Sequence, residues 1–156
     1  MDRAQARARI TALRDAEGRA NTDELDQLWA ALETVRPEEI LGRWKGSALS
    51  TGHPVEKMLI DANWHGKHFH SPDHVEPLIC RDAKGNLFSH KELGQGDASL
   101  YMVEFRGEVT ATMVYDGRPI LDHLKRIDDH TLLGCMNGKG VLDQDGRHFF
   151  FLLERE

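Results

Sequence analysis

The chain has 156 residues, of which 40% are hydrophobic and 29% charged, and its formal net charge is −6. This length and composition are typical of a single globular domain with a substantial core, and they exclude a disordered chain. No apolar run approaches the roughly 18 residues that span a bilayer, so we expect no integral membrane segment. The acidic balance argues against nucleic acid as a partner, because that function needs a clustered basic face.

The N-terminus and the cysteines indicate a cytoplasmic protein. The first residues are rich in arginine but lack the continuous apolar stretch of a secretory signal. Cys80 and Cys135 are far apart and form no CxxC motif, which favours two reduced thiols.

Two helices are expected in an N-terminal segment, residues 1–37. Residues 3–17 are rich in Ala and Arg, which favour helix, and Gly18 ends the run. Asn21 is a suitable N-cap for a second helix, whose apolar residues recur at helical spacing until Pro37. We expect the arginine-rich helix to cover the rest of the protein; the alternatives are binding to an acidic membrane or to a protein partner.

From residue 38 onward the pattern changes to short strands separated by turns. The expected strands cover residues 39–49, 65–70, 76–81, 86–90, 99–105, 108–115, 118–127, 130–136 and 147–154. Turn dipeptides such as Asp116-Gly117 join neighbouring segments as hairpins, and a short helix begins at Pro54 after the first strand. Serial hairpins place neighbouring strands antiparallel, and closure removes exposed edges. We therefore predict a mainly β protein, in which residues 38–156 form a closed or nearly closed antiparallel up-and-down β-barrel with the two helices packed outside.

The segment 118–127 carries charges within an apolar alternation. If Ile120 and Leu124 point inward, Asp122 and Arg126 share the interior face, where buried charges must be paired. Three interpretations stay open: an interior Arg126–Asp122 pair, an interior arginine that binds a carboxylate or phosphate, and a solvated outer face.

Histidines cluster in the stretch WHGKHFHSPDH. On a strand, His68 and His70 project to one face, and a zinc site there would need a third ligand, for which Asp73, His74 and His90 are candidates. Surface or hydrogen-bonding histidines are the alternative that we favour, so no metal is expected. The sequence contains no nucleophile elbow and no Gly-rich phosphate loop, so we expect a protein that is not an enzyme.

The sequence GRWKG at 42–46, with TGH at 51–53 and WHGK at 64–67, resembles the GXWXG family of bacterial proteins. The later segments EFRGEVTATMVYDGRPILDHLKRIDD and LLGCMNGKG resemble the uncharacterised C-terminal domain that accompanies this motif. We interpret the two matching segments as halves of one barrel, residues 38–95 and 96–156, because neither has enough strands to close alone.

The resemblance implies a lipocalin-like or fatty-acid-binding-protein-like barrel whose candidate ligand is a lipid, with phospholipids among the candidates. We therefore expect non-enzymatic binding of a small hydrophobic or amphipathic anionic ligand. The candidate ligand-binding residues are Lys67, Met113, Tyr115, Arg118, Asp122 and Arg126. Gly42 and Gly46 permit bends or close backbone approach, and Trp44 is expected to close one end of the barrel.

A second resemblance is to the haem-binding nitrobindin-like barrels, which also begin with a glycine-tryptophan-glycine strand. The segment GSALS departs from the glycine pattern of those barrels. His148 would be the candidate axial ligand. A haem- or metal-binding barrel and a structural or partner-binding domain are therefore the alternative functions.

Overall fold

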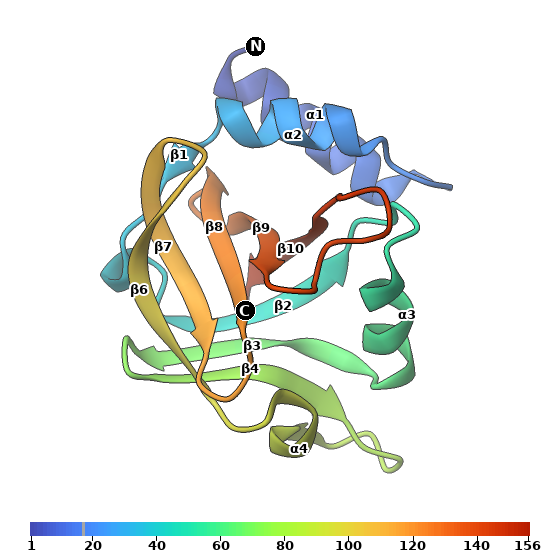
Figure 1. Ribbon diagram of the computed structural model, residues 1–156, viewed down its shortest axis with the longest axis vertical. Helices are drawn as coiled ribbons and strands as arrows, with labels where there is room; N and C mark the ends of the chain where they lie inside the picture. The colour runs from blue at the N-terminus through green and yellow to red at the C-terminus, as the bar shows by residue number, and fades with distance from the viewer. Residues whose placement is uncertain (17) are drawn as a thin grey trace.

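Antiparallel strands closed into a barrel form the body of the chain, of which the structure, a computed structural model, describes residues 1–16 and 18–156 (Figure 1). The strands are β1 (Glu33–Thr34), β2 (Gly42–Ala48), β3 (Trp64–Ser71), β4 (His74–Arg81), β5 (Leu87–Ser89), β6 (Ala98–Phe105), β7 (Glu108–Tyr115), β8 (Ile120–Asp128), β9 (Thr131–Gly138) and β10 (Phe149–Arg155). They form one sheet in the order β1-β8-β7-β6-β4-β3-β2-β10-β9, and β8 pairs again with β9, which closes the ring. The short strands β1 and β5 lie off this ring, on β8 and β4. The predicted up-and-down barrel is confirmed.

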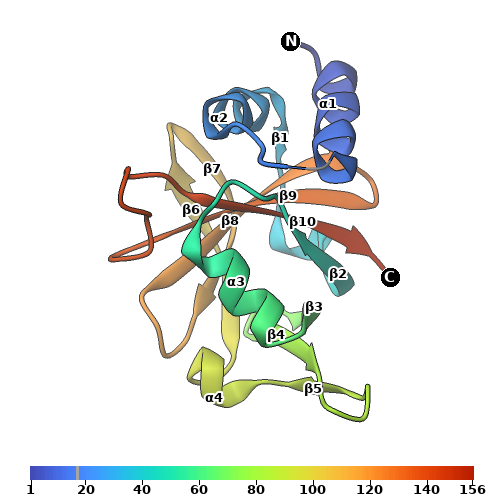
Figure 2. The ribbon, with the colours of Figure 1, turned by 90° about the vertical axis from the view of Figure 1, so that its right-hand side faces the viewer.

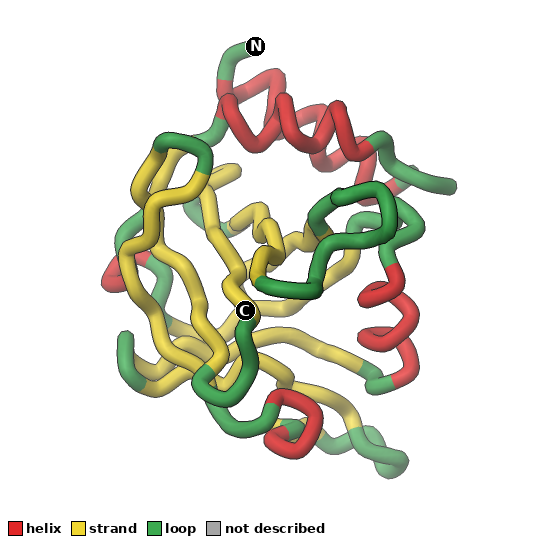
Figure 3. Tube along the Cα trace, in the orientation of Figure 1, coloured by secondary structure: helices red, strands yellow, loops and turns green. Residues whose placement is uncertain are grey.

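Helices lie outside the strands (Figure 3). They are α1 (Arg3–Asp15), α2 (Thr22–Ala31), the 3-10 helix η1 (Pro37–Glu39), α3 (Pro54–Asp61) and α4 (Lys91–Gly94). Asn21 caps α2 as predicted, since its side chain accepts hydrogen bonds from the backbone N–H groups of Asp23 and Glu24. The two N-terminal helices lie side by side over one side of the barrel, and α3 lies against another (Figure 2).

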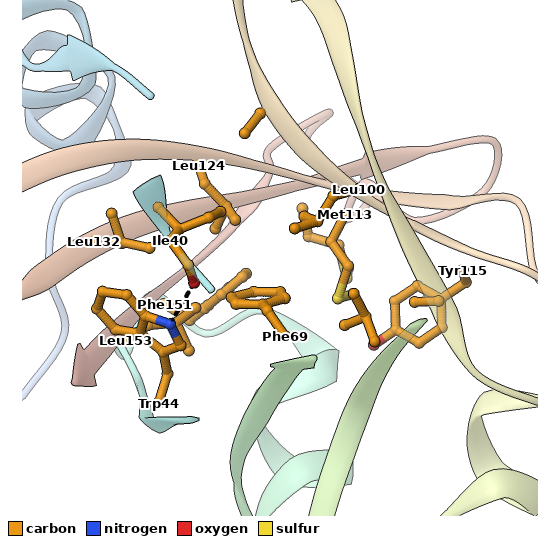
Figure 4. Packing of buried hydrophobic residues seen from close by; sticks show 14 of the residues in the cluster. Ile40, Trp44, Phe69, Leu100, Met113, Tyr115, Leu124, Leu132, Phe151 and Leu153 are labelled. Atoms are coloured by element: carbon orange, nitrogen blue, oxygen red, sulfur yellow. Dashed lines mark hydrogen bonds between the residues drawn. The ribbon is translucent and has the colours of Figure 1, made fainter. Parts of the chain in front are cut away.

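The apolar residues form two cores, one on each face of the barrel wall. The first fills the interior and includes Trp44, Phe69, Met113 and Phe151 (Figure 4). The second lies between the N-terminal helices and the outer face of β8, β9 and β10. Its buried members are Ala6, Ile10, Leu25, Leu28, Trp29, Leu32, Leu49, Ile127, Leu133, Cys135, Phe150 and Leu152. Consecutive residues of β10 alternate between the two cores, which explains why this strand is apolar on both faces.

The chain leaves the second helix earlier than predicted. Spacing extended that helix to Pro37, but α2 ends at Ala31 and β1 follows. Val35 then enters the barrel core, and its backbone N–H donates to Thr110 Oγ1 at 3.1 Å. The end of the segment 1–37 is therefore part of the barrel sheet. The helical spacing of these residues misled the prediction because the apolar side chains serve two different cores.

Candidate functional site

A lysine and an aspartate meet inside the barrel. Lys67 on β3 and Asp122 on β8 both point inward, and Lys67 Nζ lies 3.1 Å from Asp122 Oδ2. Their side chains are only 3% and 4% exposed. Lys67 Nζ also donates to the backbone carbonyl of Pro77 at 3.3 Å. The pair crosses the interior between strands that are not neighbours in the sheet.

The surroundings of this pair are largely aromatic. Lys67 Nζ lies 5.6 Å from the ring centroid of Trp64, 5.7 Å from that of Tyr115 and 5.3 Å from that of Phe151. These distances allow cation–π attraction, which partly replaces the hydration that the ammonium group loses. The aromatic rings and Asp122 thus surround the Lys67 ammonium group in an otherwise apolar interior.

Asp122 is less well satisfied than its partner. Its Oδ1 atom is buried without a hydrogen-bond partner among the described residues. Burial raises the pKa of the Asp122 carboxyl, and the charge of Lys67 opposes this shift. Burial also raises the pKa of Tyr115 well above its usual value, and the nearby Asp122 adds to that effect. The Asp122 carboxyl group is therefore easier to protonate in the barrel interior than in water. Its Oδ1 atom remains available to accept a hydrogen bond.

A cavity of about 30 Å³ adjoins the pair. It is lined by Val55, Leu59, Trp64, Lys67, Leu78, Tyr115, Asp122, Met136, Phe149 and Phe151. Such a volume has room for one or two water molecules. Most of the interior is filled by side chains, and the remaining space is lined by the lysine–aspartate pair, by Trp64 and Tyr115, and by apolar side chains.

Helix α3 covers this cavity through Val55 and Leu59. None of its residues is fully buried, and Met58 and Ile60 on its outer side are 52% and 63% exposed. His53 caps its N-terminus by accepting from the N–H of Val55, and the other ring nitrogen of His53 lies 2.9 Å from the Val141 carbonyl. The helix is therefore fixed by His53 at its first turn and otherwise contacts the core through the partly buried side chains of Val55, Leu59 and Ala62.

The six predicted ligand-binding residues separate into two groups. Lys67, Asp122, Met113 and Tyr115 come together: Met113 lies opposite Asp122 in the β7–β8 register and is fully buried. The other two residues, Arg118 and Arg126, do not line the cavity, although the charge of Arg118 acts on Tyr115 and opposes the rise in its pKa.

Arg118 follows β7 and donates from Nε to the Leu93 carbonyl at 2.9 Å, which fixes α4. Arg126 forms an ion pair with Glu39 and Asp122 pairs with Lys67, so the interior Arg126–Asp122 pair, one of the three interpretations left open, is wrong. The Cα atoms of residues four apart on a strand are about 13 Å apart, which makes a direct ion pair between such residues unfavourable.

Trp44 lies at the end of the interior core away from Tyr115 (Figure 4). Its indole N–H donates to the Ile40 carbonyl at 2.9 Å, and the Arg155 guanidinium lies 4.2 Å from its ring centroid. A Cβ on Gly46 would lie 2.1 Å from the indole of Trp64, so this position needs glycine. Gly42 has a positive φ of 122°, a conformation that also favours glycine.

The predicted histidine cluster forms on the outer face of β3 and β4. His68 and His70 stack with ring centroids 3.5 Å apart. Their carboxylate neighbour is Glu76, which the sequence analysis did not consider as a third ligand. Glu76 lies opposite His68 in the β3–β4 register, and this pairing could have suggested it. Burial lowers the pKa of His68, with His70 adding to the shift.

His148, the candidate haem ligand, lies on the helix side of the barrel wall. Its Nδ1 atom is 2.7 Å from the Met136 carbonyl, and its ring packs edge-on against Phe105. The imidazole is therefore engaged in the second core and not in the barrel interior.

The fold and the site define a class of protein: a closed antiparallel barrel whose nearly filled interior is covered by α3 and contains the buried Lys67–Asp122 pair. Residues 27–85 match the model of the GXWXG protein family, and residues 96–155 match a domain of unknown function, DUF4334. The chain belongs to this GXWXG family with its companion domain.

A solved structure has a similar sequence and the same fold. The crystal structure of a protein from Thermomonospora curvata is 35% identical in sequence and has a TM-score of 0.88, with 97% of this chain and 99% of that chain covered. Among curated proteins, none matches the sequence. Within the described residues, no helix has the length and apolar character needed to cross a membrane.

Proposed function

We propose that this protein is a non-enzymatic, lipocalin-like binding protein that takes a small amphipathic anion into the barrel under α3. The observation that carries the proposal is the buried Lys67–Asp122 pair, because both residues line the cavity and Asp122 Oδ1 has no hydrogen-bond partner among the described residues. A buried ion pair adds little to stability compared with apolar residues of the same volume. Its presence in an otherwise apolar interior is therefore better explained by recognition of a ligand.

The proposed ligand has an anionic group and a short apolar body. Its anionic group binds beside Lys67 Nζ, in the place that Asp122 occupies in the unliganded protein. Asp122 takes up a proton as it gives way, a step favoured by the raised pKa of its carboxyl group. A single-chain carboxylate is the simplest lipid with this chemistry, and a phospholipid offers a similar anionic group on a larger body.

Entry of such a ligand requires α3 to move, because the cavity of about 30 Å³ is smaller than any fatty acid. Displacing two half-buried aliphatic side chains, Val55 and Leu59, costs roughly 2–3 kcal/mol. An open state at this free energy has a population of about 1%. The proposed role of α3 is therefore that of a lid, and ligand binding favours its open form.

The proposal also places the protein in the cytoplasm. Cys80 and Cys135 are buried and unpaired, which fits a reducing compartment.

The test compares octanoate with octanol, which has a similar chain but no charge. Native mass spectrometry first shows whether protein purified from cells carries a small-molecule adduct. Thermal shift and calorimetric titration then measure both probes on the wild type, on Lys67→Met/Asp122→Leu, and on Lys139→Met, which removes an exposed lysine. We expect octanoate to bind the wild type and Lys139→Met at least about tenfold more tightly than octanol, and the double variant to lose this preference. Equal binding of the two probes by the wild type, or an unchanged preference in the double variant, contradicts the proposal.

A further inference from the structure

Three imidazole rings stack on the outer face of the β3–β4 hairpin. The ring centroids of His68 and His70 are 3.5 Å apart, and those of His70 and His74 are 4.3 Å apart. Alternation along β3 directs His68 and His70 to the same face, while Lys67 between its neighbours points inward. The imidazole rings therefore point away from the interior, although Lys67 is also among the residues that line the surface cavity beside His68 and Glu76.

Glu76 completes a set of three donor groups with two of these histidines. Glu76 Oε1 lies 2.6 Å from His70 Nε2 and 4.0 Å from His68 Nδ1. One donor atom from each of the three residues can be chosen so that all lie within 4.8 Å of one another. In a tetrahedral zinc site with bonds of about 2.0–2.1 Å, neighbouring donor atoms are about 3.3 Å apart. Small side-chain rotations would therefore bring the three donors to the required spacing.

The backbone and the burial of these residues favour such a site. His68 and Glu76 are register partners in adjacent strands, so the sheet fixes the distance between their Cα atoms. The side chains of His68, His70 and Glu76 are 21%, 32% and 24% exposed, which restricts their rotamers while leaving the donor atoms accessible.

We propose that His68, His70 and Glu76 bind one Zn²⁺ ion on this face of the barrel. Two imidazole nitrogens and one carboxylate oxygen suit zinc, whereas Mg²⁺ and Ca²⁺ select sites made of oxygen donors. Three protein ligands leave a fourth coordination position open. His74 stacks behind His70 and is not one of the ligands.

The open position has a groove beside it. His68 and Glu76 also line a surface cavity of about 290 Å³, together with Arg43, Ile79 and Phe88. Arg43 is the register partner of His68 on β2, which places a cation next to the metal. The fourth ligand is accordingly water or a small anion that enters from this groove.

The test is calorimetric titration of tag-free protein with ZnCl₂ and, separately, with CoCl₂ monitored by visible absorption, with chelator-treated protein as the starting material. We expect one Zn²⁺ per chain and a tetrahedral Co²⁺ spectrum for the wild type. His70→Ala and Glu76→Gln should each weaken Zn²⁺ binding by at least about tenfold. His74→Ala tests the neighbour that stacks but does not bind, and His130→Ala, outside the cluster, is the matched control; both should change the affinity less than threefold.

Several outcomes would overturn the assignment. Absence of zinc binding and of the cobalt spectrum in the wild type does so, as does unchanged affinity in His70→Ala or Glu76→Gln. A loss in His74→Ala as large as that in His70→Ala would show a different ligand set. Circular dichroism spectra establish that each variant is folded, so a loss of binding is not mistaken for a loss of structure.

Discussion

Replacing Lys67 with methionine should destabilise the protein strongly and in a pH-dependent way. The substitution keeps the length of the side chain but leaves Asp122 buried without its cation. Removing one partner of a buried ion pair typically costs about 3–5 kcal/mol. The isolated carboxyl group escapes part of this cost by remaining protonated in the folded state, because burial already raises its pKa.

The size of the effect follows from this protonation. In the unfolded chain Asp122 ionises near its ordinary pKa of 3.8. If the folded variant keeps the proton, its own stability falls by about 1.4 kcal/mol per pH unit above that value, or roughly 4 kcal/mol by pH 7. The loss relative to the wild type is smaller than this, because burial also raises the pKa of Asp122 in the wild type. The direction of this pH dependence follows because the pKa of Asp122 is higher in the folded variant than in the unfolded chain. The free energy of unfolding is therefore unaffected below the unfolded-state pKa and decreases as the pH rises above it.

The assay is urea unfolding at several pH values between 4.5 and 7.5, with the wild type measured at each pH so that other titrating groups cancel. Lys67→Met/Asp122→Leu should recover stability to within about 1 kcal/mol of the wild type, since it removes both charges. A loss in Lys67→Met that is the same at pH 4.5 and pH 7.5, or that stays below about 1 kcal/mol at pH 7.5, would refute the reasoning.

Three further predictions concern the rest of the barrel wall. His123 is buried, and burial is the main reason why its pKa is lowered to about 4. The free energy of unfolding of the wild type should therefore fall by up to about 3 kcal/mol between pH 6.5 and pH 4. His123→Gln should remove this pH dependence in urea unfolding. Gly66→Ala should cost more in melting temperature than Gly46→Ala, because its Cβ would lie 1.9 Å from a backbone carbonyl oxygen whereas that of Gly46 meets an indole ring at 2.1 Å; equal losses would contradict this. Ile10→Ala, in the core under α1, should lower the free energy of unfolding in urea by about 2–4 kcal/mol. Arg7→Ala, on the exposed face of the same helix, should lower it by less than about 0.5 kcal/mol. Similar losses for the two variants would mean that α1 does not cover the barrel in solution.

Local turn chemistry predicted most of the barrel. Asp116-Gly117 lies between β7 and β8 as expected, and each predicted strand corresponds to an observed one. The strand that was missed, β1, depends on a distant partner. β1 exists because Glu33 and Thr34 pair with β8, more than ninety positions later in the chain, and no local signal reveals that pairing.

The candidate site shows the same division. Alternation within β8 placed Asp122 correctly in the interior, but it offered Arg126 as the partner because only residues of the same strand were compared. The true partner, Lys67, comes from β3 on another part of the ring. Lys67 alternates with Phe69 along β3 and therefore points inward, which the strand pattern can predict. Alternation does not reveal which residue of a distant strand lies across the barrel interior, so the pairing of Lys67 with Asp122 was not predicted.

Strand β3 thus contributes to both proposed sites, with Lys67 directed inward and His68 and His70 directed outward. Because the two sites lie on opposite faces of one wall, their chemistry should be separable. Lys67→Met/Asp122→Leu should lose the preference for octanoate while it binds Zn²⁺ like the wild type, and Glu76→Gln should lose zinc while it retains that preference. If either variant lost both activities while remaining folded, the two faces would be coupled through β3, and the barrel wall would have to be treated as one site.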